Sequence, residues 1–261
     1  MTPPLVIKIV NVFAFVFLLG YNSYAGLFEE PDKSPYHDTH PTYFTPACFV
    51  YGVWGLIHAL LLGFVIYQFF PAANEVVFDG IHWHFLSINV WNAVWLFAYE
   101  KNHTILAIIP ILFLAGQVSY VYFTIKERYP AQTWGETLWI HAPFSLFHGW
   151  VFVLTILSLF VAFSQEKVDD ESPTILTKIL VFFGLLILEL TAVSYIERFK
   201  GDIAGAVVIA WTLYGIAAEQ DDTFIRWTAI AFGVITSFHI LKPTFKKFVL
   251  GRREEGAPLL G

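Results

Sequence analysis

The side chains that could do chemistry lie inside long apolar stretches, where polar groups are costly and therefore informative. One stretch interleaves tryptophan with asparagine. Trp91 and Trp95 are four residues apart on one helix face, and Asn89 and Asn92 are three apart on a neighbouring face. Buried indole N–H groups and amides require hydrogen-bond partners. Such a helix lines a cavity for a flat apolar ligand with a few polar atoms, or it holds neighbouring helices together, and the pattern leaves both interpretations open.

Histidines are the second group, and the chain has nine of them. His141 and His148 are seven residues apart, which places them on one helix face but too far apart to bind one metal ion. The sequence has neither a His-Glu-x-x-His motif nor a cysteine cluster. Two haems stacked along one helix would each need a second axial histidine from a partner helix, and His58 is the candidate for one of them. We therefore expect no metal site and no resident cofactor, while haem or a porphyrin stays open as a ligand.

Glu189 is the only carboxylate well inside an apolar stretch. It suits either a hydrogen-bonded packing role or a proton relay with His148 or Gln117. A relay would make the chain a proton-coupled secondary transporter of a small substrate, although no internal repeat is visible. The sequence contains no Walker A motif, nucleophile elbow or kinase signature, so it predicts a protein that is not an enzyme.

The elements that must position these residues are long apolar segments. Of 261 residues, 57% are hydrophobic and only 14% are charged, whereas soluble domains carry about 25% charge. Apolar runs of about 20 residues match the ~30 Å hydrocarbon layer of a bilayer. The predicted fold class is therefore all-α, a polytopic membrane helix bundle with about eight transmembrane helices. We expect spans at about 5–26, 45–70, 81–99, 104–125, 138–164, 174–196, 203–218 and 223–241.

Three of these spans are less clear than the others. The first resembles a signal peptide, because Lys8 and an apolar run precede Ser23-Tyr24-Ala25, a small-residue cleavage site. Its length and Asn11 favour an uncleaved span instead. The third span is the most polar. The seventh is short enough to be little tilted or partly interfacial.

Charge distribution predicts the orientation and excludes one class of partner. The net charge of −6 provides no basic footprint for nucleic acid. If the N-terminus is cytoplasmic, ten of the fifteen Lys and Arg residues lie on the cytoplasmic side. An even number of spans then places both termini in the cytoplasm, in a membrane that the sequence does not identify. The expected partners are membrane lipids and a hydrophobic small molecule, and a homodimer stays open.

Three short motifs are the most specific part of the sequence. Residues 49–57 read Phe-Val-Tyr-Gly-Val-Trp-Gly-Leu-Ile, residues 89–95 read Asn-Val-Trp-Asn-Ala-Val-Trp, and Pro143-Phe144-Ser145 precedes Gly149-Trp150. They resemble the Phe-Gly-x-x-Trp-x-x-Leu-Tyr, Asn-x-x-Trp and Pro-Tyr-x-x-Trp motifs of the tryptophan-rich sensory protein/translocator protein (TspO/MBR) family. The longer, eight-span relatives are more similar still. They share Thr45-Pro46-Ala47, Tyr67-Gln68 and a late Trp-x-x-x-Gly-Ile at 211–216.

The resemblance, over roughly residues 5–240, implies an architecture and a ligand class. The compact family is a five-helix bundle that binds porphyrins and sterols in a helical pocket. For this chain, the resemblance implies one integral membrane domain over 1–261. A TspO-like core would lie at about 45–196, with extra helices at about 5–26, 203–218 and 223–241. The family's Lys-Pro…Trp…Pro-Pro segment, which helps to close the pocket, is missing, and Pro41, Thr45 and Pro46 stand roughly in its place.

The leading hypothesis is a non-enzymatic membrane receptor or carrier that binds a porphyrin or a sterol between its helices. Aromatic faces would stack on the ligand, and His and Asn side chains would bind its polar edge. The expected ligand-binding residues are Trp54, His58, Asn89, Trp91, Asn92, Trp95, Pro143, Ser145, His148 and Trp150. Two alternatives stay open, namely a proton-coupled transporter that uses Glu189 and a haem-binding membrane electron carrier.

Overall fold

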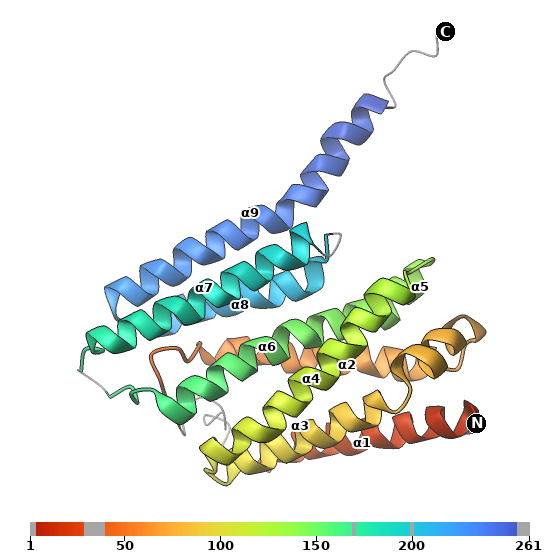
Figure 1. Cartoon of the computed structure of the whole chain (residues 1–261), viewed down its shortest axis with the longest axis horizontal. Coiled ribbons are helices and arrows are strands. Elements are labelled where there is room, and N and C mark those ends of the chain that lie inside the picture. The colour runs from red at the N-terminus through yellow and green to blue at the C-terminus, as the bar shows by residue number, and fades with distance from the viewer. Residues whose placement is uncertain (1–3, 29–39, 169–170, 199–200, 255–261) are drawn as a thin grey trace.

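The computed structural model describes residues 4–28, 40–168, 171–198 and 201–254, and this part of the chain is helical without a strand (Figure 1). The long helices are α1 (Pro4–Phe28), α2 (Val53–Tyr67), α3 (His84–Glu100), α4 (Thr104–Arg128), α6 (Ala142–Phe163), α7 (Ile175–Glu197), α8 (Ile203–Glu219) and α9 (Thr223–Glu254). Shorter pieces connect them. These are the 3₁₀ segments η1 (Cys48–Gly52) and η2 (Pro71–Ala73), the π-helical segments η3 (Val76–Ile81) and η4 (Thr137–His141), and α5 (Trp134–Glu136).

The eight long helices lie where the eight spans were predicted, which confirms the all-α polytopic bundle. Within the described residues, six segments are long and apolar enough to cross a membrane, including α4 and the continuous Trp134–Phe163 segment. The other two long helices are α3 and α8, with 17 residues each. They correspond to the span predicted to be most polar and the span predicted to be short.

The last predicted span, 223–241, agrees with the apolar segment Thr223–Lys242 of helix α9. The helix continues to Glu254 and projects beyond the bundle (Figure 1). Residues 243–254 lie beyond that apolar segment and carry the charged residues Lys246, Lys247, Arg252, Arg253 and Glu254. These residue types have high helix propensity, so a helix continues where an apolar span has ended.

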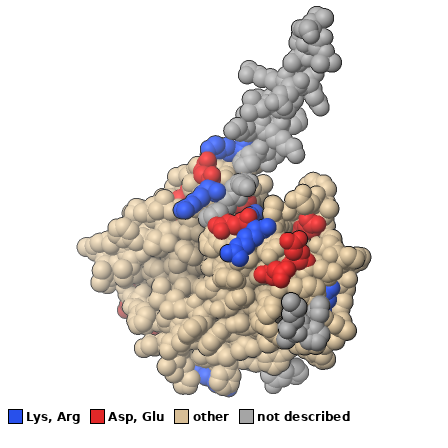
Figure 2. All heavy atoms as spheres, turned by 45° about the vertical axis from the view of Figure 1, so that its right-hand side comes forward, with Lys and Arg blue, Asp and Glu red and all other residues tan. Residues whose placement is uncertain are grey.

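The helices pack in a chain of neighbours centred on α6. Helix α1 packs on α3 and α2, α4 lies between α3 and α6, and α6 contacts α8. Helices α7, α8 and α9 pack against one another. The beginning of α1 and the end of α9 lie at the same end of the molecule, as eight antiparallel helices require (Figure 1). Figure 2 brings this end forward and shows acidic and basic side chains gathered there.

Buried polar side chains join α1 to the end of α2. The Asn11 amide donates to Gln68 Oε1 at 3.0 Å, and the Gln68 amide donates to the Lys8 carbonyl at 3.2 Å. Lys8 Nζ in turn donates to Asn74 Oδ1 at 2.7 Å. These hydrogen bonds fix the position of α1 along the bundle, since each would be left unsatisfied if the helix slid by one turn.

The opposite end of the bundle is closed by contacts between loops. The Gln220 amide donates to the carbonyls of Thr42 and Thr45 at 3.2 and 2.8 Å. Lys178 Nζ lies 2.7 Å from Asp222 Oδ2. Partial burial alone would raise the pKa of Asp222, but hydrogen bonds from Lys178 and from the backbone beside it lower that pKa below its usual value. The loop that stands in place of the family's pocket-closing segment is thus held against the α8–α9 turn.

Helices α6 and α8 approach closely at a pair of glycines. A Cβ atom added at Gly149 would lie 2.8 Å from the Gly205 carbonyl oxygen and 3.0 Å from its Cα. Small residues allow such approach between membrane helices, where packing replaces the hydrophobic effect as the main attraction. Close packing of α6 on α8 therefore explains why glycine occupies position 149 of the Gly149-Trp150 motif.

We expect Gly149→Ala to lower the free energy of unfolding by about 1–3 kcal/mol, because the added methyl group forces two backbones apart. Gly116→Ala in α4 is the matched control, since a Cβ there meets nothing within 4 Å and alanine is the better helix former. Thermal unfolding of the detergent-purified variants measures both. A Gly149→Ala protein as stable as Gly116→Ala would contradict the close contact.

Candidate functional site

Three phenylalanines bring α2, α3 and α6 together at one level. The ring centroids of Phe64 and Phe85 are 5.2 Å apart, and those of Phe64 and Phe144 are 5.1 Å apart. Phe85 and Phe144 complete the triangle at 6.2 Å. All three side chains are fully buried, so this triangle fixes the faces that the three helices turn toward each other.

An indole–imidazole cluster lies further along α2 and α6. The Trp54 ring stacks on the His58 ring at 5.4 Å and an interplanar angle of 20°. It meets the rings of Phe147 and Trp150 edge to face, with centroids 5.8 and 6.0 Å apart. Trp150 also meets Tyr51 edge to face at 5.9 Å. The predicted residues Trp54, His58 and Trp150 are therefore brought together.

Helix α3 supplies the amides. Phe85 contacts α2 and α6, and ten residues later the Trp95 indole N–H donates to Ser158 of α6 at 3.3 Å. Asn89 and Asn92 lie between these two contacts at spacings of three and four residues, hence on the same face of the helix. Both are buried. The face of α3 that meets α2 and α6 thus carries two amides between two aromatic contacts.

The buried polar side chains of these three helices are incompletely satisfied. Among the buried side-chain atoms that lack a hydrogen-bond partner within the described residues, six belong to five of the predicted ligand-binding residues. They are Trp54 Nε1, His58 Nε2, Asn89 Oδ1, Asn92 Nδ2, Asn92 Oδ1 and Trp150 Nε1. We call these five residues the unsatisfied set. An unpaired buried polar atom costs about 1–3 kcal/mol, and a single interface that gathers six of them requires an explanation.

Two other predicted residues, Ser145 and His148, turn to the other side of α6, where Ser145 meets a buried aspartate. Asp202 precedes α8, and its carboxylate accepts hydrogen bonds from Ser145 Oγ at 2.6 Å and from Tyr122 Oη at 2.8 Å. Lys126 Nζ lies 2.8 Å from the same carboxylate. His148 donates to or accepts from Ser119 at 3.0 Å and Tyr195. Ser145 and His148 therefore do not lie with the unsatisfied set.

We call the group of Tyr122, Lys126, Ser145 and Asp202 the Asp202 cluster. It connects α4, α6 and the start of α8, and every one of its side chains has a partner. Tyr122, Lys126 and Asp202 are not among the site residues predicted from the sequence. The available signal was Asp202 immediately before an apolar span, which is a helix N-cap pattern. That pattern does not reveal which distant lysine the carboxylate meets.

The remaining predicted residues lie apart from both groups. Trp91 is half-buried and stacks on Phe113 of α4 at 4.6 Å. Pro143 occupies the first turn of α6, where a proline is well tolerated. Glu189 is buried between α7 and α9 and accepts a hydrogen bond from Thr236. Its predicted relay partners have other contacts, since Gln117 bonds to His84 and His148 bonds as described above.

The histidines do not converge. His58 belongs to the unsatisfied set, whereas the Nε2 of His141 donates to the Tyr129 carbonyl at 2.9 Å. Both ring nitrogens of His148 already have hydrogen-bond partners. Among the described residues, no group of three or more His, Cys, Asp or Glu side chains could hold a metal ion. Of these histidines, His58 is the one with a buried ring nitrogen available to a ligand.

Comparison with protein families decides the family. The family model described as TSPO-like protein matches residues 8–241. The chain belongs to the TSPO-like protein family. The match begins in α1 and ends in α9, so all eight long helices of this TSPO-like protein lie within or overlap it. Comparison of the chain with curated proteins and with solved structures gave no match.

Proposed function

We propose that this TSPO-like protein is a non-enzymatic membrane receptor or carrier, which binds a flat hydrophobic ligand, a porphyrin or a sterol, between α2, α3 and α6. The unsatisfied set carries the proposal. Trp54, His58 and Trp150 offer two indole N–H groups and an imidazole nitrogen, and Asn89 and Asn92 add amide groups. A ligand with a broad apolar face and a few polar atoms at its edge suits these side chains, because rings stack on it and N–H groups bind its oxygens.

A route from the bilayer supports a hydrophobic ligand. A groove of about 430 Å³ lies between α2, α6 and α8, with Val53, Leu146 and Trp211 among its apolar lining residues. Val53 and Leu146 are the chain neighbours of Trp54 and Phe147, which belong to the indole–imidazole cluster. A ligand dissolved in the hydrocarbon layer would therefore reach the outside of the site without crossing water.

The test is equilibrium binding of protoporphyrin IX, followed by its Soret absorption, and of radiolabelled cholesterol to the detergent-purified protein. We expect saturable binding of one of them. We expect about fivefold to tenfold weaker binding of that ligand in the double variant Trp54→Phe/His58→Leu, which keeps the apolar volume but removes two polar contacts. Soret absorption is preferred to tryptophan quenching, because the variants change the number of tryptophans.

Trp227→Phe is the matched control, since Trp227 is exposed on α9 and belongs neither to the groove nor to the unsatisfied set. It should bind as the parent does. Failure of both ligands to saturate the parent protein, or equal affinity in the parent and the double variant, would remove this proposal.

A further inference from the structure

A buried carboxylate lies at the contact between α7 and α9, away from the proposed ligand site. Glu189 is 5% exposed, and its Oε2 accepts a hydrogen bond from Thr236, which is fully buried. Its Oε1 has no hydrogen-bond partner within the described residues. Neither residue belongs to the unsatisfied set or to the Asp202 cluster. The described part of the chain thus offers one hydroxyl donor to the two oxygens of this carboxyl group.

The depth of this carboxyl group in the bilayer favours its protonated form. Glu189 lies in the apolar segment Ile175–Glu197, eight residues or about 12 Å before its end. The hydrocarbon layer is about 30 Å thick, so Glu189 lies within it. An ionised carboxylate at this depth is costly without a cation or several hydrogen-bond donors. A carboxylic acid carries no charge, so the single donor and the surrounding hydrocarbon suit it better.

Polar side chains continue from Thr236 toward the end of the bundle that carries both termini. His239 is three residues after Thr236, hence about one turn further along the same face of α9. Its Nδ1 lies 3.2 Å from Glu197 Oε1, and Lys242 Nζ lies 2.5 Å from the same oxygen. His239 is also close enough to Glu189 for its charge to act on that carboxyl group. Exposure rises along this series, from 0% at Thr236 to 30% at His239 and 57% at Lys242, so polar groups lead from the buried acid to water.

The other half of the contact between α7 and α9 is aromatic. The ring centroids of Phe182 and Phe232 are 5.9 Å apart, and Phe232 is one turn before Thr236. Helix α8 packs against both helices, and its titratable side chains are Tyr214, which bonds to a serine of α9, and Glu219 at its far end. Among the described residues, a polar route to the buried acid therefore leads only toward the termini.

We propose that Glu189 is a proton-binding site inside the bilayer, which exchanges its proton with water at the end that carries both termini through His239 and Glu197. An imidazole accepts a proton on one ring nitrogen and releases one from the other, so His239 suits the transfer. Glu197 accepts the proton next, and its side chain is 43% exposed. The proposed ligand site uses none of these residues, so the proton site goes beyond the proposed function and does not rest on it.

Dicyclohexylcarbodiimide tests whether Glu189 carries a proton, because this apolar reagent reacts with protonated carboxyl groups inside membranes. The acid proton moves to one nitrogen of the reagent, and the carboxyl oxygen adds to its central carbon. Rearrangement then gives a stable N-acylurea without a leaving group. We expect mass spectrometry of the full chain, reconstituted in liposomes at neutral pH, to find this adduct on Glu189. Glu189→Gln should abolish it.

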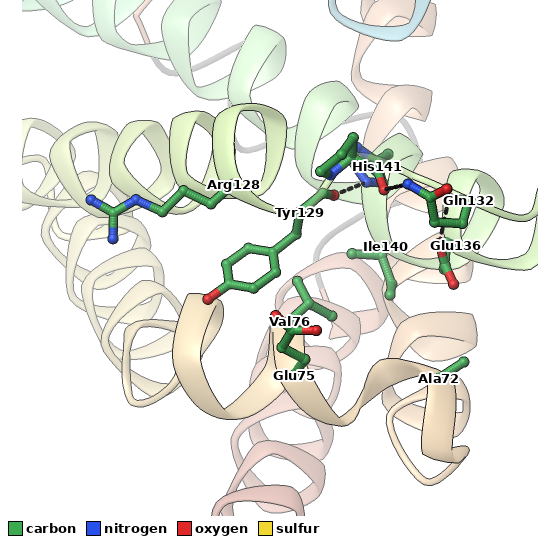
Figure 3. Close-up of a pocket in the computed structure, with 10 residues that line it drawn as sticks. Ala72, Glu75, Val76, Arg128, Tyr129, Gln132, Glu136, Ile140 and His141 are labelled. Atoms are coloured by element: carbon green, nitrogen blue, oxygen red, sulfur yellow. Dashed lines mark hydrogen bonds between the residues drawn. The ribbon is translucent and has the colours of Figure 1, made fainter.

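Glu75→Gln is the matched control for the labelling. Glu75 is exposed and lines a cavity of about 200 Å³ at the same end of the bundle (Figure 3). Water solvates that carboxylate, and a reagent dissolved in the hydrocarbon layer does not reach it. The control variant should therefore carry the adduct on Glu189 as the parent does.

Two further measurements test the route. In vesicles whose protein has its C-terminus outside, labelling of Glu189 should fall when the outer medium is made alkaline and should not change when only the lumen is. Infrared spectroscopy measures the exchange itself. The C=O band of the acid is identified by its loss in Glu189→Gln, and it shifts on transfer to D₂O. In His239→Leu/Glu197→Gln we expect this shift to be at least about tenfold slower.

Each other outcome overturns the proposal. A folded parent without the adduct excludes a proton held on Glu189. Labelling that follows the pH of the lumen, of both sides or of neither side excludes access from the end that carries the termini. Exchange as fast in the double variant as in the parent excludes His239 and Glu197 as the route. None of these readouts involves porphyrin or sterol binding, so failure here leaves the proposed function unaffected.

Discussion

Replacement of Asp202 by asparagine should lower the free energy of unfolding by about 2–4 kcal/mol, because it leaves the Lys126 ammonium without its counter-ion in a mostly buried position. The Asp202 side chain is 5% exposed and that of Lys126 is 23% exposed, so water replaces the lost partner only in part. The carboxylate also accepts hydrogen bonds from Ser145 and Tyr122. In asparagine one of the two carboxylate oxygens becomes an NH₂ group, which cannot accept the hydrogen bonds that these donors offer.

The measurement is reversible unfolding of the purified protein in detergent, with a double-mutant cycle. Lys126→Met/Asp202→Asn removes both charges and should recover part of the stability lost in Asp202→Asn. The matched control is Asp221→Asn, because Asp221 is 86% exposed and its ion pair with Arg226 is a surface pair. That variant should change the free energy of unfolding by less than about 0.5–1 kcal/mol. Equal stability of Asp202→Asn and Asp221→Asn would show that the buried pair contributes nothing.

The positions of the helices could be predicted because the bilayer sets a length that apolar runs must match. The predicted 174–196 and the observed Ile175–Glu197 differ by one residue at each end. The same criterion predicted the last span, 223–241, which agrees with the apolar segment Thr223–Lys242. Helix α9 continues as a polar helix to Glu254, and hydropathy carries no information about helices outside the bilayer.

The candidate site could be predicted only in part, because its contacts join residues that are far apart in the sequence. Local spacing placed Asn89 and Asn92 on one face, and the structure turns that face toward α2 and α6. Spacing does not tell which side of α6 a residue occupies in the bundle. Ser145 and Trp150 both looked like pocket residues, but Ser145 meets Asp202, 57 residues away in the sequence, and Trp150 meets Trp54.

Substitution of Asn92 by leucine separates stability from function and has an unusual sign. Asn92 is fully buried, and both atoms of its amide lack partners within the described residues. Leucine has a similar size and no polar atoms, so Asn92→Leu should raise the free energy of unfolding of the ligand-free protein by about 1–2 kcal/mol. If the amide is retained for a ligand, the same change should weaken protoporphyrin or sterol binding at least about fivefold. Stabilising substitutions at functional positions commonly show this opposition.

Asn11→Leu is the control that distinguishes a functional amide from a structural one. Asn11 is equally buried in a membrane helix, but its amide donates to Gln68 at 3.0 Å. Its replacement should lower the free energy of unfolding by about 1 kcal/mol, since the buried Gln68 Oε1 loses its donor, and should leave ligand affinity unchanged. Unfolding and binding measured on both variants give four results with defined signs. Destabilisation by Asn92→Leu as well would mean that its amide is satisfied within the bundle, and the strongest support for a ligand between α2, α3 and α6 would then be lost.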